Sequence, residues 1–129
     1  MAGLPDAENQ GDHAIRRDLK WSHGEKGIAR KAYERALDRE FQAVIRTAKE
    51  MAGKIEQPAD LWDLESYLTE SRREIDRKYD YRYSVLIEVF GRLVREGRLR
   101  EEELRGLRED KLESIRSYAR ILARLDAVA

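Results

Sequence analysis

The stretch DLWDLESYLTESRREIDRKYDYRYSVLIEVFGRLVREG, residues 60–97, decides the fold class of this chain. Its first part has leucines and an isoleucine at helical intervals, which predicts a polar helix with one apolar edge. Trp62 falls about 100° from Leu61 on that helix, at the shoulder of the apolar edge. A connector of tyrosines and charges, KYDYRYS, leads to a strongly apolar run that we expect to be the buried centre of a small helical head. Glu88 is the polar exception in that run.

A longer helix is expected before this stretch, starting at a capping box. In SHGE the Ser22 hydroxyl can accept from the third backbone amide of the helix while Glu25 reaches back to the cap. Apolar residues then recur at helical spacing until Gly53 and Pro58. A last helix is expected after the charged turn REEELRGLRED, with an apolar stripe made of Leu112, Ile115, Ala119, Leu122 and Leu125. The sequence shows no period-two strand pattern, so the predicted class is all-α.

The length of the first helix predicts self-association. About thirty residues make a rod of roughly 45 Å, whereas a compact domain of this size has a radius of gyration of only ~13 Å. The rod should overhang its own domain, and a second copy related by a two-fold axis is the simplest cover for its apolar stripe. The residues expected at this homodimer interface are Leu37, Phe41, Val44, Ile45, Leu61 and Leu68.

One folded domain is expected over residues 21–129, after a flexible N-terminal tail at 1–20. Within the domain, we expect long helices over about 22–78 to form the dimer and a head over about 79–125. No apolar stretch approaches the ~20 residues of a membrane span, and the N-terminus lacks the apolar region of a signal peptide. A cytoplasmic protein is therefore expected.

Composition argues against most catalytic chemistry. The 129 residues include no cysteine, and the two histidines, His13 and His23, lie in or beside the tail. Zinc and transition-metal sites, and cofactors held by such ligands, are therefore not expected. Glycine-rich phosphate loops are missing from the sequence, and no serine has an evident base partner. We expect a protein that is not an enzyme.

The arginines of the second half raise the alternative of a nucleic-acid adaptor. The 26 basic and 26 acidic residues cancel, so no overall field favours nucleic acid. Acidic residues also interleave with the arginines, and no aromatic residues alternate with them as a stacking surface would require. A helix face carrying ion pairs is the preferred interpretation, and binding that weakens steeply with salt would mark the alternative. The arginines are Arg92, Arg95, Arg98, Arg100, Arg105 and Arg108.

The helix that carries Trp62 has two open interpretations. In the first, Trp62 packs in a core or dimer seam and Arg72 pairs with Asp76 one turn on. In the second, the helix is a contact patch for another protein, because Trp, Tyr and Arg dominate binding energies at interfaces. An exposed face could then gather Trp62, Glu65, Ser66 and Arg72, with Tyr67 nearby.

Several segments resemble the fluorescence recovery protein family: WSHGEKGIARKAYERALDRE, DLW, REIDRKYDYRYSVLI, VF, RLVREG and EEL. The resemblance covers about residues 21–121. It implies an all-helical homodimer with long helices at the dimer interface and a small head at each end. Members of the family occur in phototrophs with phycobilisomes. The resemblance implies a non-enzymatic regulator that binds the C-terminal domain of photoactivated orange carotenoid protein and speeds its return to the resting state.

The resemblance also assigns partner-binding residues, and the match is mixed. The key Trp and Arg of the family correspond to Trp62 and Arg72, and an aromatic is retained as Tyr67. A His-Asp pair is replaced by Glu65 and Ser66, while a Phe of the head is replaced by Glu88 and a Lys of the last helix by Ser114. These changes leave two hypotheses open. The partner is orange carotenoid protein or a homologue of its C-terminal domain, or the scaffold now binds a different protein.

Overall fold

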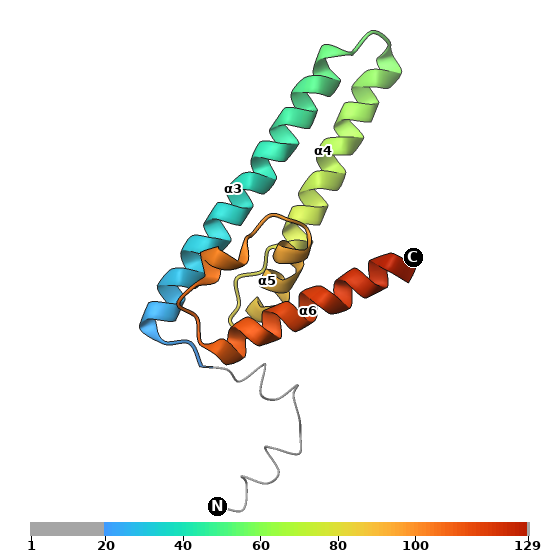
Figure 1. The fold of residues 1–129 in the computed structure, drawn as a ribbon. Helices are drawn as coiled ribbons and strands as arrows, with labels where there is room; N and C mark the ends of the chain where they lie inside the picture. Colours follow the sequence, from blue (N-terminus) through green and yellow to red (C-terminus); the bar gives the residue numbers. More distant parts are fainter. Residues whose placement is uncertain (1–19, 129) are drawn as a thin grey trace, which may run out of the picture.

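A computed structural model describes residues 20–128, which form a helical hairpin standing on a helical head (Figure 1). The hairpin consists of α3 (His23–Gly53) and α4 (Pro58–Lys78), which lie side by side. The head consists of α5 (Leu86–Arg95), the short 3-10 helix η1 (Glu101–Leu104) and α6 (Glu109–Val128). The all-α prediction is confirmed. The tail expected at 1–20 lies outside the described residues except for Lys20.

Local hydrogen bonds explain where the hairpin helices begin. The Glu25 amide donates to Ser22 Oγ at 3.1 Å and the Ser22 amide donates to Glu25 Oε1 at 3.0 Å, so the predicted capping box is present. Pro58 opens α4, where its missing N–H costs nothing. Asp60 then accepts from the amides of Gln57, at 3.0 Å, and Glu56, at 2.9 Å.

The head core forms where α5 crosses α6. Leu86, Phe90 and Leu93 of α5 are fully buried, as the apolar run predicted. Gly91 permits the close crossing, because a Cβ there would meet Tyr118 Cδ2 at 2.7 Å. Leu125, the last residue of the expected apolar stripe, is 58% exposed, so the core of the head does not extend to it. The last turns of α6 extend past the head (Figure 1).

The tyrosines of the connector KYDYRYS pack against the first half of α3. Tyr33 of α3 makes edge contacts with Tyr79, at 5.5 Å between ring centroids, and with Tyr81, at 4.8 Å. Tyr83 continues the series to Trp21, with centroids 5.6 Å apart. The connector tyrosines therefore pack against the core, a role that the apolar periodicity does not reveal.

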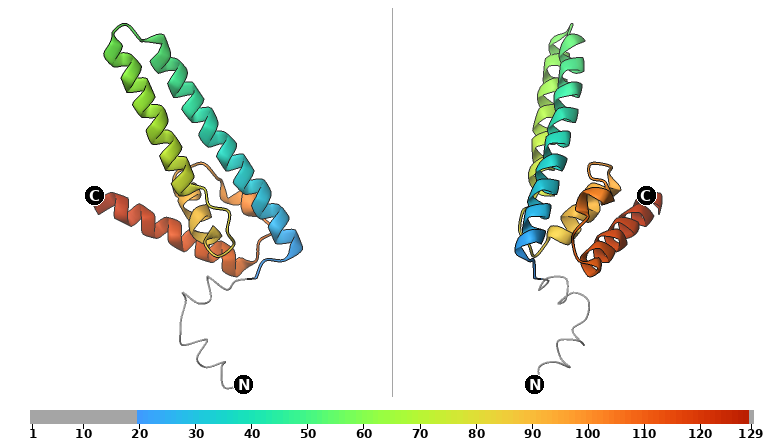
Figure 2. Two further views of the ribbon diagram at one scale, coloured as in Figure 1. Left: turned by 180° about the vertical axis from the view of Figure 1, so that it is seen from behind. Right: turned by 60° about the vertical axis from the view of Figure 1, so that its left-hand side comes forward.

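An ion pair joins the hairpin to the head. Arg39 of α3 donates to both carboxylate oxygens of Glu103 at 2.7 Å and to the Arg98 carbonyl at 2.9 Å. Seen nearly edge-on in Figure 2, the two hairpin helices form one layer, and α5 and α6 lie together on one side of it. The far half of the hairpin therefore receives no cover from the head.

Candidate partner-binding faces of the hairpin

The far half of the hairpin carries exposed apolar side chains. Phe41 and Ile45 of α3 and Leu61 and Leu68 of α4 are each exposed to between 43% and 48%. They are four of the six residues predicted for the dimer interface. Val44 is half-buried in the seam between the helices, and Leu37 packs against the core of its own head. An apolar surface of this kind usually marks an interface.

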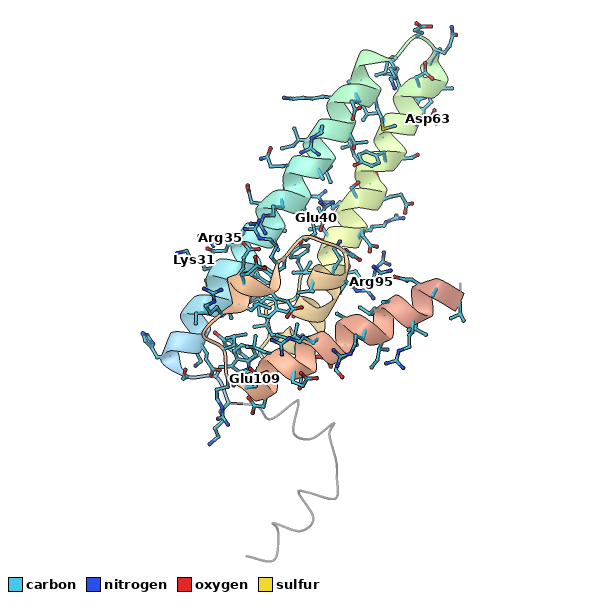
Figure 3. All side chains as sticks on the ribbon, in the orientation of Figure 1. Lys31, Arg35, Glu40, Asp63, Arg95 and Glu109 are labelled. Carbon is cyan, nitrogen blue, oxygen red and sulfur yellow. The ribbon has the colours of Figure 1, made fainter. Side chains whose placement is uncertain are left out.

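Trp62 is the most exposed large hydrophobic residue of the hairpin, at 64%. It lies near the N-terminal end of α4, the end away from the head, beside Asp63, which is labelled in Figure 3. No core residue of the described chain covers it, so packing inside the protomer does not explain this tryptophan. Packing in the core of a single chain is therefore excluded as the role of Trp62. A place in a dimer seam and a place in a contact patch for another protein both remain open.

Arg72 lines a groove of about 360 Å³ together with the apolar residues Phe41, Leu68 and Ile75. Asp76 lies in the same groove, but no ion pair joins it to Arg72 within 4.0 Å. The predicted pairing of these two residues is therefore absent from the described protomer. The guanidinium is left beside an apolar surface, where it is available to a partner.

Tyr67 lies on the other side of the seam between α3 and α4. It lines a groove of about 430 Å³ whose rim includes Glu70, Glu74 and Arg98. The helical rotation between Tyr67 and Arg72 explains this separation, because five residues turn through about 500°. The structure therefore places Tyr67 and Arg72 in different grooves of one hairpin.

Glu65 and Ser66 occupy the exposed surface near Trp62. The Thr69 hydroxyl donates to Glu65 Oε2 at 3.0 Å, so Glu65 is paired along its own helix and does not serve as a partner for Arg72. Glu88 is remote in the fold: it lies in a hollow of the head with Arg77 and Tyr118. The predicted partner-binding residues thus occupy two regions of the molecule, the hairpin and the head.

The joint between these regions is a buried charge network around Glu40, which is labelled in Figure 3. Glu40 Oε1 accepts from Lys78 Nζ at 2.9 Å, Tyr79 Oη at 2.9 Å and Arg98 Nε at 3.2 Å. Burial alone would raise the pKa of Glu40, but the bonds from Lys78 and Tyr79 lower it below its ordinary value. Burial, with the bond to Glu40, raises the pKa of Tyr79. The network holds the tyrosine neutral and the carboxyl charged.

A second buried pair was not predicted from the sequence. Lys111 of α6 is fully buried, and its Nζ donates to Glu25 at 3.1 Å. Glu25 also accepts from the Arg108 amide at 2.8 Å, so the capping residue of α3 holds the start of α6. Burial would raise the pKa of Glu25, but the bonds from Ser22, Arg108 and Lys111 lower it. Since the local capping role already explained Glu25, no sequence signal pointed to the distant lysine.

Most arginines of the arginine-rich run form ion pairs. This is the interpretation that the sequence favoured over a nucleic-acid adaptor. Four of its six members pair with acidic side chains: Arg92 with Glu96, Arg95 with Asp126, Arg98 with Glu40, and Arg108 with Asp110.

Among residues 20–128, no group of three or more acidic, His or Cys side chains is placed to hold a metal ion. Within the same residues, no helix has the length and apolarity needed to cross a membrane.

The fold defines a class: an all-helical protein with a long hairpin on a small head, whose hairpin carries exposed apolar side chains. Residues 21–119 match the family model described as photoprotection regulator fluorescence recovery protein. The chain belongs to this family.

Relatives in the family match nearly their whole length. The fluorescence recovery protein of Synechocystis sp. PCC 6803 is 41% identical over 104 residues, which cover 81% of this chain and 95% of the relative. The solved structure of the Fremyella diplosiphon protein has a TM-score of 0.76 at 42% identity and covers 78% of this chain and 99% of that one. The Synechocystis structure has the same TM-score and coverage at 40% identity.

Proposed function

We propose that this protein is a homodimeric photoprotection regulator that binds one conformation of a carotenoid-binding partner. The partner is orange carotenoid protein or a homologue of its C-terminal domain. Two features of α4 carry the proposal: the exposed Trp62 and, about 15 Å farther along the helix, a groove that presents Arg72 beside apolar side chains. Exposed aromatic and arginine residues of this kind dominate binding energies at protein interfaces.

The proposed mechanism needs no covalent chemistry. A regulator that binds the photoactivated partner, and has a higher affinity for the conformation that leads back to the resting state than for the other, shifts the partner's population toward that conformation and lowers the barrier to re-association. A larger shift requires a larger difference between the two affinities. The ion pairs between hairpin and head support this role, because a rigid surface selects one partner shape at a lower entropic cost.

A second candidate is a family scaffold that binds a different, unrelated protein. Two observations favour it: Glu65 is bonded to Thr69 along its own helix, and a carboxylate at Glu88 stands where the resemblance places an apolar contact. A charge in a contact that was apolar disfavours the original partner unless a new group pairs with it.

The test follows the dark recovery of photoactivated orange carotenoid protein by absorbance. We expect the wild-type protein to speed recovery, and Trp62→Ala to weaken that effect by tenfold or more, because hot-spot residues contribute about 2 kcal/mol or more. Lys31→Ala, an exposed change on α3 near the head, is the matched control and should leave recovery unchanged. No acceleration at large molar excess of the wild type would leave the second candidate.

A further inference from the structure

One hollow of the head contains a buried carboxylate oxygen to which residues 20–128 supply no hydrogen bond. The hollow has a volume of about 170 Å³ and lies where the end of α4, the connector, α5 and α6 meet. Its charged residues are Arg77, Lys78, Asp80, Glu88 and Arg92. Glu88 Oε1 is buried and has no hydrogen-bond partner among the described residues.

The other charged side chains of the hollow already have partners. Lys78 donates to Glu96 at 2.6 Å, and Arg92 lies 3.5 Å from the second oxygen of the same carboxylate. Arg77 pairs with Glu74, and Arg82 donates to Asp80 at 2.6 Å. Lys78 and Arg92 share Glu96, while Arg77 and Arg82 face Glu74 and Asp80, so no ion pair within 4.0 Å joins Glu88 to a cation of the described residues. A buried carboxylate oxygen without a donor is unfavourable, and a ligand that supplies the donor gains from it.

The walls of the hollow indicate what kind of donor fits. Val85, Val89 and the ring of Tyr118 line it beside the carboxylate. An arginine suits such a site, because its aliphatic stem packs on apolar walls while its planar guanidinium stacks on an aromatic ring and bonds a carboxylate. The protein uses this contact internally, where the Arg30 guanidinium lies 3.8 Å from the centroid of Tyr81. The volume also exceeds that of a single bound water.

We propose that the hollow receives an arginine side chain of the protein partner, with Glu88 accepting its charge-assisted hydrogen bond. This inference rests on the proposed function, since it assumes that the head faces a protein partner. Glu88 then determines specificity: it favours a partner with arginine at the contact and disfavours one with an apolar or acidic group there. The hairpin residues and the hollow would be two separate contacts of one complex.

The test uses the full chain and a small probe, Nα-acetyl-arginine amide, with Nα-acetyl-norleucine amide as the uncharged control. NMR shifts of the α5 amides are followed as each probe is added. We expect saturable shifts with the arginine probe only, and a dissociation constant raised about tenfold in Glu88→Gln, as for a lost hydrogen bond to a charged group. Glu102→Gln, an exposed change on η1, should behave as wild type.

Two outcomes would overturn the inference: no saturable response to the arginine probe, or equal binding by Glu88→Gln with an unchanged far-UV spectrum and melting temperature. The probe also separates the two proposals. If Glu88-dependent arginine binding is present but orange carotenoid protein recovery is not accelerated, the hollow stands and the proposed partner is wrong.

Discussion

At the residue scale, Glu103 shows how one side chain couples two parts of the molecule. Its carboxylate is nearly buried and accepts two hydrogen bonds from Arg39 of the hairpin and one from the Arg100 amide of η1. The bonds from Arg39, opposed by burial and assisted by the Arg100 amide, lower the pKa of Glu103 to about 2. A lowered pKa in the folded state stabilises the protein above the ordinary pKa of the group, and that stabilisation is lost as pH falls toward 2.

We therefore predict that Glu103→Gln lowers the free energy of unfolding at neutral pH by about 1.5–3 kcal/mol, the range for hydrogen bonds to charged groups. It should also flatten the loss of stability between the ordinary pKa of a glutamate and about 2. Urea unfolding at several pH values measures both effects. Glu102→Gln, its exposed neighbour, should change the free energy by less than about 0.5 kcal/mol. An identical pH dependence in Glu103→Gln and wild type would contradict the assignment.

At the element scale, the crossing of α5 and α6 depends on a missing side chain. A Cβ at Gly91 would lie 3.0 Å from Tyr118 Cβ and 3.2 Å from the Ile115 carbonyl oxygen, neither of which can move without shifting α6. We predict that Gly91→Ala lowers the free energy of unfolding by about 1–3 kcal/mol, the usual cost of overpacking. Gly27→Ala is the matched control, because nothing lies within 4 Å of its added Cβ. In the second turn of α3 that change should stabilise the protein by up to about 0.5–1 kcal/mol. Thermal or urea unfolding measures the difference, and equal effects of the two changes would refute the close crossing.

At the scale of the whole molecule, the hairpin helices extend well beyond the part of them that the head covers. The far halves of α3 and α4 contact each other, while Phe41, Ile45, Leu61 and Leu68 remain exposed. If a second copy covers them, stability depends on protein concentration, because dimer formation stabilises the folded state by mass action. We predict a melting temperature that rises with protein concentration. Leu68→Glu should abolish that dependence and yield a monomer by light scattering, because it places a charge in the apolar face. A wild type that is monomeric at micromolar concentration would remove the dimer proposal.

The sequence by itself determined the helices. Their periodicity and caps involve residues three or four positions apart, so the all-α class, the capping box of Ser22 and the buried face of α5 could be predicted locally. The tertiary structure alone decided which helix faces meet. It paired Glu25 with Lys111, 86 residues away, packed the connector tyrosines against the core, and placed Tyr67 and Arg72 in different grooves. The reason is that contacts between distant segments depend on how the whole chain closes and on which faces it leaves uncovered, and no local pattern records either.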